Sequence, residues 1–279
     1  MSNTQDYAQN VTEVSKAELL ESIYRKFHKK EYLHPDPLEL VLNYTNPADQ
    51  EIAGIIASSF ATGRVKSIVK AVSGILALFP DLRSDLLKSK REKLEELLGG
   101  FRYRFYNSRS LIEFLEGIKK TIIEFGSLEN CFKVGMMGTE EETKSVFGGM
   151  TFLVDNIEGK SKANRRILPV PENGSAMKRL NMFLRWMVRK DSIDPGPWNN
   201  ISAADLIIPL DTHIMQISRI LGFTDRKQSD RSTALEITKA LKVIDPEDPV
   251  RFDFSLSRLG IHPDLSYNEL LQNGCEIIS

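Results

Sequence analysis

The sequence predicts an all-α protein, and three observations support this prediction. Apolar residues recur three and four positions apart in most segments, as they do on the buried face of a helix. Helix-start signals, such as Asn46-Pro47 and the pair Ser15 and Glu18, precede several of these segments. No segment shows the strict alternation of apolar and polar residues that is typical of a strand. We therefore expect a single helical domain over residues 1–279, divided into two lobes.

Composition excludes several classes of protein. The chain has 279 residues, of which 41% are hydrophobic and 27% charged, as in a soluble globular protein with a real core. No apolar run is long enough for a membrane span and no signal segment is visible, so we expect a cytoplasmic monomer that does not bind membranes. Two distant cysteines and four scattered histidines lack metal-ligand spacing, so we expect no metal and no cofactor.

The helical pattern divides the chain as follows. Residues 1–14 read as a loose tail, and residues 135–149 as a loop with a turn. The lobes are expected at about 47–160 and 161–265, with the N-terminal helix packed on one of them. We expect helices over residues 15–32, 38–44, 47–61, 64–76, 80–100, 111–125, 150–157, 212–221, 233–243 and 250–260, and one that begins near Ser175.

Two features of the first lobe have both a structural and a functional interpretation. Arg64 stands at the corner between two helices, either as a ligand contact or as a plain corner charge. The segment 101–107 interleaves arginines with aromatic residues, a pattern that can stack nucleobases. An amphipathic piece with its aromatic rings in the core explains the same pattern, and we prefer it.

The charge is distributed unevenly along the chain. Residues 160–190 contain nine basic residues, among them Arg166 and Arg179, and one acid, Glu172, although the whole chain has a net charge of −1. A local excess of this size predicts a basic patch for a polyanion, whereas a solvated loop is the plainer interpretation.

Lys178 follows a constrained turn that contains Asn173 and Gly174. The turn delivers the chain into a helix near Ser175, where free backbone N–H groups and the helix dipole favour a phosphate. An amine at such a helix start is a candidate nucleophile, although most helix lysines are simply solvated.

Asp211 lies directly before the helix 212–221. Aspartate is a preferred N-cap residue, so a structural role explains it well, and a capping carboxylate can still face a cleft. His213 follows in the same P-L-D-T-H run and is expected to hydrogen-bond structurally.

Together these residues resemble the helix-hairpin-helix DNA glycosylase superfamily, which includes endonuclease III and the 8-oxoguanine glycosylases. The resemblance rests on a helix pair near residues 50–78, a hairpin ending in G-x-x-x-K, the P-L-D-T-H run and a late D-F-S-L-S-R-L-G segment. It covers roughly residues 47–262. The resemblance implies two helical lobes with a helix-hairpin-helix motif and a cleft between them. More narrowly, the chain looks like an uncharacterised bacterial family that lies near this superfamily.

The resemblance implies roles for individual residues. Gly174 matches the first hairpin glycine, Lys178 the Schiff-base lysine and Asp211 the catalytic aspartate. Asn173, Gly174, Ser175, Arg179, Arg166 and Arg64 would contact DNA. Trp198 and His213 would line the base pocket, although packing explains Trp198 at least as well.

Three departures from the superfamily pattern stand out. Asp211 follows Lys178 by 33 residues, a longer separation than usual, because of an insertion around residues 191–201 that contains Trp198. Ala176 replaces the second hairpin glycine, and Gln216 stands where arginine is common.

The resemblance implies a base-excision repair glycosylase with AP lyase activity on a damaged base such as an oxidised purine. Lys178 would attack the sugar, and Asp211 would stabilise the positive charge that develops there. A catalytically silent module that binds DNA or structured RNA is the alternative. A helical scaffold without a nucleic-acid role is the third interpretation.

Overall fold

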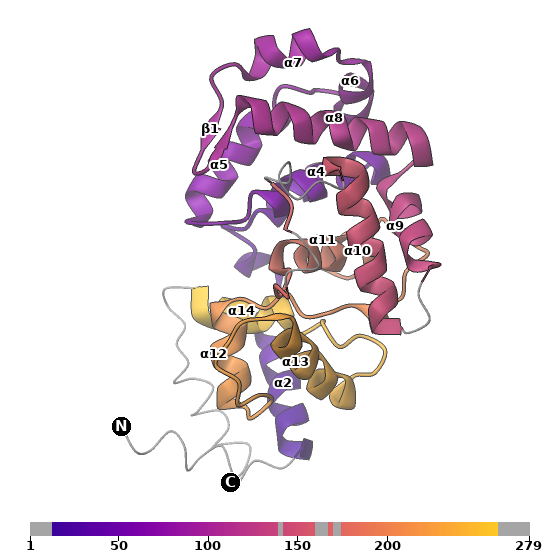
Figure 1. Ribbon diagram of the computed structural model, residues 1–279. Helices are drawn as coiled ribbons and strands as arrows, with labels where there is room; N and C mark the ends of the chain where they lie inside the picture. The colour runs from indigo at the N-terminus through magenta and orange to yellow at the C-terminus, as the bar shows by residue number, and fades with distance from the viewer. Residues whose placement is uncertain (1–12, 139–141, 160–166, 170–173, 262–279) are drawn as a thin grey trace.

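The computed structural model describes residues 13–138, 142–159, 167–169 and 174–261. These residues form an all-α fold with one small pair of strands (Figure 1), which confirms the predicted class. In the described part of the chain, no helix has the length and apolar character that a membrane crossing requires.

The helices and strands follow in chain order. They are α2 (Glu13–Phe27), η1 (Lys30–Tyr32), α3 (Leu38–Leu42), α4 (Pro47–Ser59), α5 (Val65–Leu76), α6 (Leu82–Lys88), α7 (Arg91–Leu98), β1 (Arg102–Tyr103), β2 (Tyr106–Asn107), α8 (Ser108–Phe125), α9 (Leu128–Met136), α10 (Glu142–Glu158), α11 (Lys178–Val188), η3 (Ala203–Asp205), α12 (Thr212–Ile220), α13 (Arg231–Ile244) and α14 (Asp253–Ile261).

The helices form two packing groups. Helices α4 to α10 make the upper group in Figure 1, and α2, α12, α13 and α14 make the lower one. Helix α11 packs on α4, so it belongs with the upper group rather than with the helices that follow it. The approach is close because Gly54 of α4 has no side chain: a Cβ atom there would lie 2.7 Å from Cε of Met187.

Local capping signals place several helix starts correctly. Asn46 caps α4 through a bond from the backbone N–H of Ala48, with Pro47 at the first helical position. Asp230 caps α13 by accepting from the backbone N–H of Thr233. These capping contacts join residues that are close in the sequence, so they form largely independently of the tertiary structure.

Other boundaries differ from the predictions. Helix α10 begins at Glu142, so most of the expected loop 135–149 is helical. The segment 80–100 forms two helices, and α2 ends at Phe27 instead of continuing to residue 32. The segment 101–107 is a short antiparallel hairpin, although no strand was expected. Two paired residues on each side are too few to produce a visible alternation.

The hairpin also separates the aromatic residues of its segment. Tyr103 and Tyr106 pack edge-on against Phe60, as the core interpretation expects. Phe105 is different, since it lies at the tip and is 85% exposed.

Candidate functional site

One cavity of about 800 Å³ receives its lining from both helix groups. The lining residues come from the segments 35–37, 61–68, 175–186, 209–213 and 253–258, together with Pro169 and Ser229. The cavity therefore lies where the start of α11 meets the starts of α12 and α14. Its size is within the usual range for small-molecule sites.

Lys178 and Asp211 face each other across this cavity. Lys178 is the first residue of α11 and Asp211 is the N-cap of α12. The Nζ atom of Lys178 lies 3.6 Å from Oδ2 of Asp211, and their side chains are 39% and 16% exposed. Residues 33 positions apart thus meet in one accessible site, as the facing helix starts predicted.

The two oxygens of Asp211 have different partners. Oδ1 accepts hydrogen bonds of 2.9 Å from the backbone N–H groups of His213 and Ile214, as a helix cap does. Oδ2 is the atom directed at Lys178. Capping and a role in the cavity are therefore compatible, because each occupies a separate oxygen.

The chain turns sharply just before Lys178. Gly174 has a φ of 68°, and Met177, the N-cap of α11, has a φ of 54° in the left-handed region. No side chain caps α11 in the described structure, so the N–H groups of its first turn have no side-chain acceptor there. Ser175 pairs with Asp230, which fastens the turn to the start of α13.

The remaining predicted DNA contacts are placed as follows. Ser175 lines the cavity, whereas Gly174 is exposed and is not part of the lining. Arg64 is an exposed N-cap of α5, next to the cavity-lining Gly63 and Val65. Asn173 and Arg166 lie outside the described residues.

Arg179 lines the cavity but is bound to the protein. Its Nη1 donates to the carbonyl oxygens of Ser59 and Ile167 and to the Tyr106 hydroxyl, at 2.5–3.0 Å. This guanidinium therefore joins the end of α4, the hairpin and residue 167. The expected DNA contact of Arg179 stays a prediction, which concerns the part of the side chain that lines the cavity.

Trp198 is a core residue. It is 4% exposed, packs against Phe132 and Phe183, and donates from Nε1 to Oε1 of Glu51 at 2.9 Å. It does not line the cavity, so it cannot stack on a base there. The insertion thus serves packing, while His213 does line the cavity.

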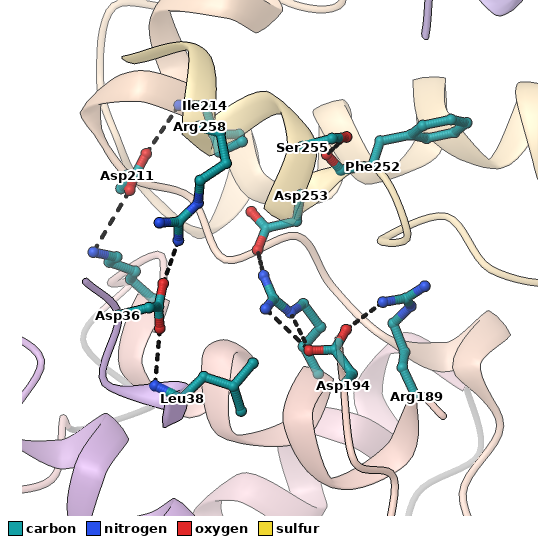
Figure 2. A network of polar contacts seen from close by, with 12 residues as sticks. Asp36, Leu38, Arg189, Asp194, Asp211, Ile214, Phe252, Asp253, Ser255 and Arg258 are labelled. Atoms are coloured by element: carbon teal, nitrogen blue, oxygen red, sulfur yellow. Dashed lines mark hydrogen bonds and ion pairs between the residues drawn. The ribbon is translucent and has the colours of Figure 1, made fainter. Parts of the chain in front are cut away.

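A cluster of buried ion pairs borders the cavity, and Figure 2 shows part of it. Arg185 of α11 and Arg189, the C-cap of the same helix, are 5% and 4% exposed. Arg185 binds Asp194 and Asp253, and Arg189 binds Asp191, Asp194 and Asp248. His28 joins the cluster through a 2.9 Å contact from Nε2 to Asp191.

The cluster corrects the predicted basic patch. Arg185 and Arg189 were counted in it, yet both are buried and neutralised by carboxylates. Burial alone would lower the pKa of Arg185, but Asp194 and Asp253 raise it, so the guanidinium keeps its charge. These two residues therefore add nothing to an outer basic surface.

Asp253 connects the cluster to the cavity. It is 3% exposed, lines the cavity and accepts a hydrogen bond from Arg185. Burial raises its pKa to about 6, since the opposing effect of Arg185 is only partial and the charge of Asp211 adds to the rise. A second buried pair, Asp36 and Arg258, lines the cavity beside it.

The sequence interpretation assigned no role to Asp253 or Asp36. The available signal was an aspartate inside an apolar run: Asp253 stands between Phe252 and Phe254 at the start of the last helix. A buried charge in such a place requires a partner, but the sequence does not show which residue provides it.

The described ranges contain no group of three or more His, Cys, Asp or Glu side chains placed to hold a metal ion. Comparison with curated proteins gives no match, and neither does comparison with solved structures. A family model does match, over residues 36–262, which is most of the chain. The chain belongs to the family described as "Protein of unknown function (DUF2400)".

Proposed function

We propose that this protein is a DNA glycosylase with AP lyase activity that removes a damaged base, such as an oxidised purine. The observation that carries the proposal is the Lys178–Asp211 pair, with 3.6 Å between Nζ and Oδ2 in an accessible cavity. An amine nucleophile beside a carboxylate is what base removal through a Schiff base requires.

In this mechanism the amine of Lys178 attacks C1′ of the extruded nucleotide, and the bond from C1′ to the base breaks. Asp211 stabilises the positive charge that develops on the sugar. Its Oδ1 atom is held by two backbone N–H groups, so Oδ2 keeps its direction while the sugar enters. The enzyme-linked sugar then rearranges to a Schiff base, from which strand cleavage follows.

The hairpin next to the cavity has features that favour DNA binding. The hairpin is tied to the lining by a 2.7 Å hydrogen bond from the Tyr103 hydroxyl to the carbonyl of Thr62. At the hairpin tip, the guanidinium of Arg104 lies 5.5 Å from the ring of the exposed Phe105. Exposed aromatic rings next to cations favour stacking with bases and contact with phosphates.

A catalytically silent DNA- or RNA-binding module is the second candidate. The observation in its favour is the same contact, because an ion pair of Lys178 with Asp211 is also an ordinary structural link between two helices. The two candidates differ in whether Lys178 forms a covalent bond with DNA.

Borohydride trapping on a duplex with a single abasic site tests the proposal. We expect the wild-type protein to give a covalent adduct, and Lys178→Ala to give none. Lys239→Ala is the matched control, because Lys239 is an exposed helix lysine outside the cavity lining. It should trap like the wild type.

Asp211→Asn separates the two candidates further. Asparagine can still cap α12, so the fold and DNA binding should survive while adduct formation falls sharply. Salt-dependent DNA binding without any adduct would support the silent module instead. A Lys178→Ala protein that traps DNA as well as the wild type would remove Lys178 from the mechanism.

A further inference from the structure

The buried cluster contains more carboxylates than cations. Arg185 and Arg189 form ion pairs with four carboxylates, which are Asp191, Asp194, Asp248 and Asp253. Even with His28 protonated, full ionisation leaves a net negative charge in a region that is largely closed to water. Such an excess is relieved when one carboxyl group holds a proton.

The contacts indicate which carboxyl group this is. Asp194 is fully buried but accepts from both arginines. The side chains of Asp191 and Asp248 are 20% and 25% exposed, so water shares their charge, although burial also raises the pKa of Asp248. Asp253 is 4% exposed at its side chain, and within the described residues its one side-chain donor is Arg185. The excess negative charge is therefore greatest at Asp253, which is also the carboxylate of the cluster that lines the cavity, next to Arg185.

The charges around Asp253 support this assignment. Arg185 approaches from α11 and opposes protonation, whereas Asp194 and Asp211 favour it. Arg258 of the same helix is neutralised by Asp36. Figure 2 shows Asp253 between Asp211 on one side and Asp194 on the other. With burial as the largest cause, the pKa of this carboxyl rises to about 6.

We propose that Asp253 is the general acid of the site and protonates the base as it leaves. This inference rests on the glycosylase function proposed above. Of the carboxyl groups that line the cavity, Asp211 would then supply negative charge and Asp253 a proton, while Asp36 stays paired with Arg258. When the environment raises the pKa of one of two neighbouring acids, this is a common sign of a general acid beside a charged partner.

The step balances as follows. The neutral amine of Lys178 forms a bond to C1′ and becomes a secondary ammonium group. The bond from C1′ to the base breaks, and its electron pair goes to the base. The proton of the Asp253 carboxyl passes to a ring nitrogen of that base. Asp253 is left as a carboxylate, and Arg185, already bound to it, compensates the new charge.

Base release requires both the nucleophile and the acid. Trapping on an abasic site requires only the nucleophile, because no base is left to protonate. Comparing the two reactions therefore separates the role of the acid from that of the nucleophile. We expect Asp253→Asn to lower base release from an 8-oxoguanine duplex by about 10²–10⁴-fold, the usual contribution of a general acid. Trapping on the abasic duplex should stay near the wild-type level. Asparagine can still accept the Arg185 hydrogen bond, so the variant should fold.

Asp248→Asn is the matched control from the same cluster, because Asp248 binds Arg189 but does not line the cavity. It should change both reactions equally or not at all. Wild-type base release should also decline as pH rises through about 6, because the acid form is lost. Equal losses of release and trapping in Asp253→Asn would overturn the proposal in favour of a structural role.

A carboxyl titration by NMR tests the acid independently of activity. The wild type should show one carboxyl that titrates near pH 6, is absent in Asp253→Asn, and titrates lower in Asp211→Asn. Absence of this titration overturns the inference whatever the enzyme does. If the titration is present but the wild type traps no abasic DNA, the glycosylase function fails while the proton on Asp253 stands.

Discussion

Replacing Asp253 by asparagine should change how the stability of the fold depends on pH. Burial raises the pKa of Asp253 from 3.8 to about 6, so the folded state binds this proton more tightly than the unfolded chain does. The contribution is fully present below pH 3.8 and is lost as pH rises through about 6. Asp253→Asn cannot titrate, so it lacks this dependence.

The size of the effect follows from the shift. One pKa unit corresponds to about 1.36 kcal/mol, so the full term is about 3 kcal/mol. Between pH 5 and pH 7.5 the accessible part is about 1.4 kcal/mol, because at pH 5 the folded state is mostly protonated and the unfolded state is not. We therefore expect Asp253→Asn to gain about 1.4 kcal/mol relative to the wild type over this interval.

Urea unfolding at pH 5, 6, 7 and 7.5 measures this difference. Comparing variant with wild type cancels the other titrating groups, provided that the m-values agree. Glu247→Gln, which removes an exposed carboxylate near the cluster, controls for the loss of one charge. If the free energies of wild type and Asp253→Asn run parallel from pH 5 to 7.5, the assignment of the buried proton is refuted.

Three further predictions concern other parts of the structure. Gly196→Ala should cost about 2–4 kcal/mol of unfolding free energy, because its φ is 53° and the new Cβ would lie 2.5 Å from a backbone carbonyl oxygen. Gly174→Ala, with a φ of 68° but open space, should cost clearly less in the same urea experiment. Trp198→Phe should lose about 1–3 kcal/mol of unfolding free energy, because the buried Glu51 loses its indole donor, and it should trap abasic DNA normally. A selective loss of trapping would show that Trp198 takes part in the site. Phe105→Ala should leave the melting temperature unchanged and weaken binding to duplex DNA by about 1–3 kcal/mol in a titration at fixed salt, and unchanged affinity would exclude a stacking role.

The all-α class and the helix starts near Lys178 and Asp211 could be predicted because they depend on local signals. Asp211 is recognisable as a cap from its place before an amphipathic helix, and Lys178 from the turn that precedes it. The cavity then brings these two termini together. The hairpin at 101–107 was missed because its pairing is too short to leave a pattern.

The buried cluster was not predictable for a different reason. Arg185 and Arg189 are charged, so a periodicity argument places them on a solvent face. Their partners Asp248 and Asp253 come from more than fifty residues further along the chain, and nothing local identifies them. Trp198 was misplaced likewise, because its partner Glu51 belongs to α4.

The contact between Lys178 and Asp211 spans the boundary between the two packing groups. Lys178 belongs to α11, which is packed on α4, whereas Asp211 begins α12, which is packed on α14. Any sliding of one group against the other changes the distance from Nζ to Oδ2 directly. The site is therefore complete only while the two groups are docked. Mutations far from the cavity that loosen this docking should weaken the site without changing any lining residue.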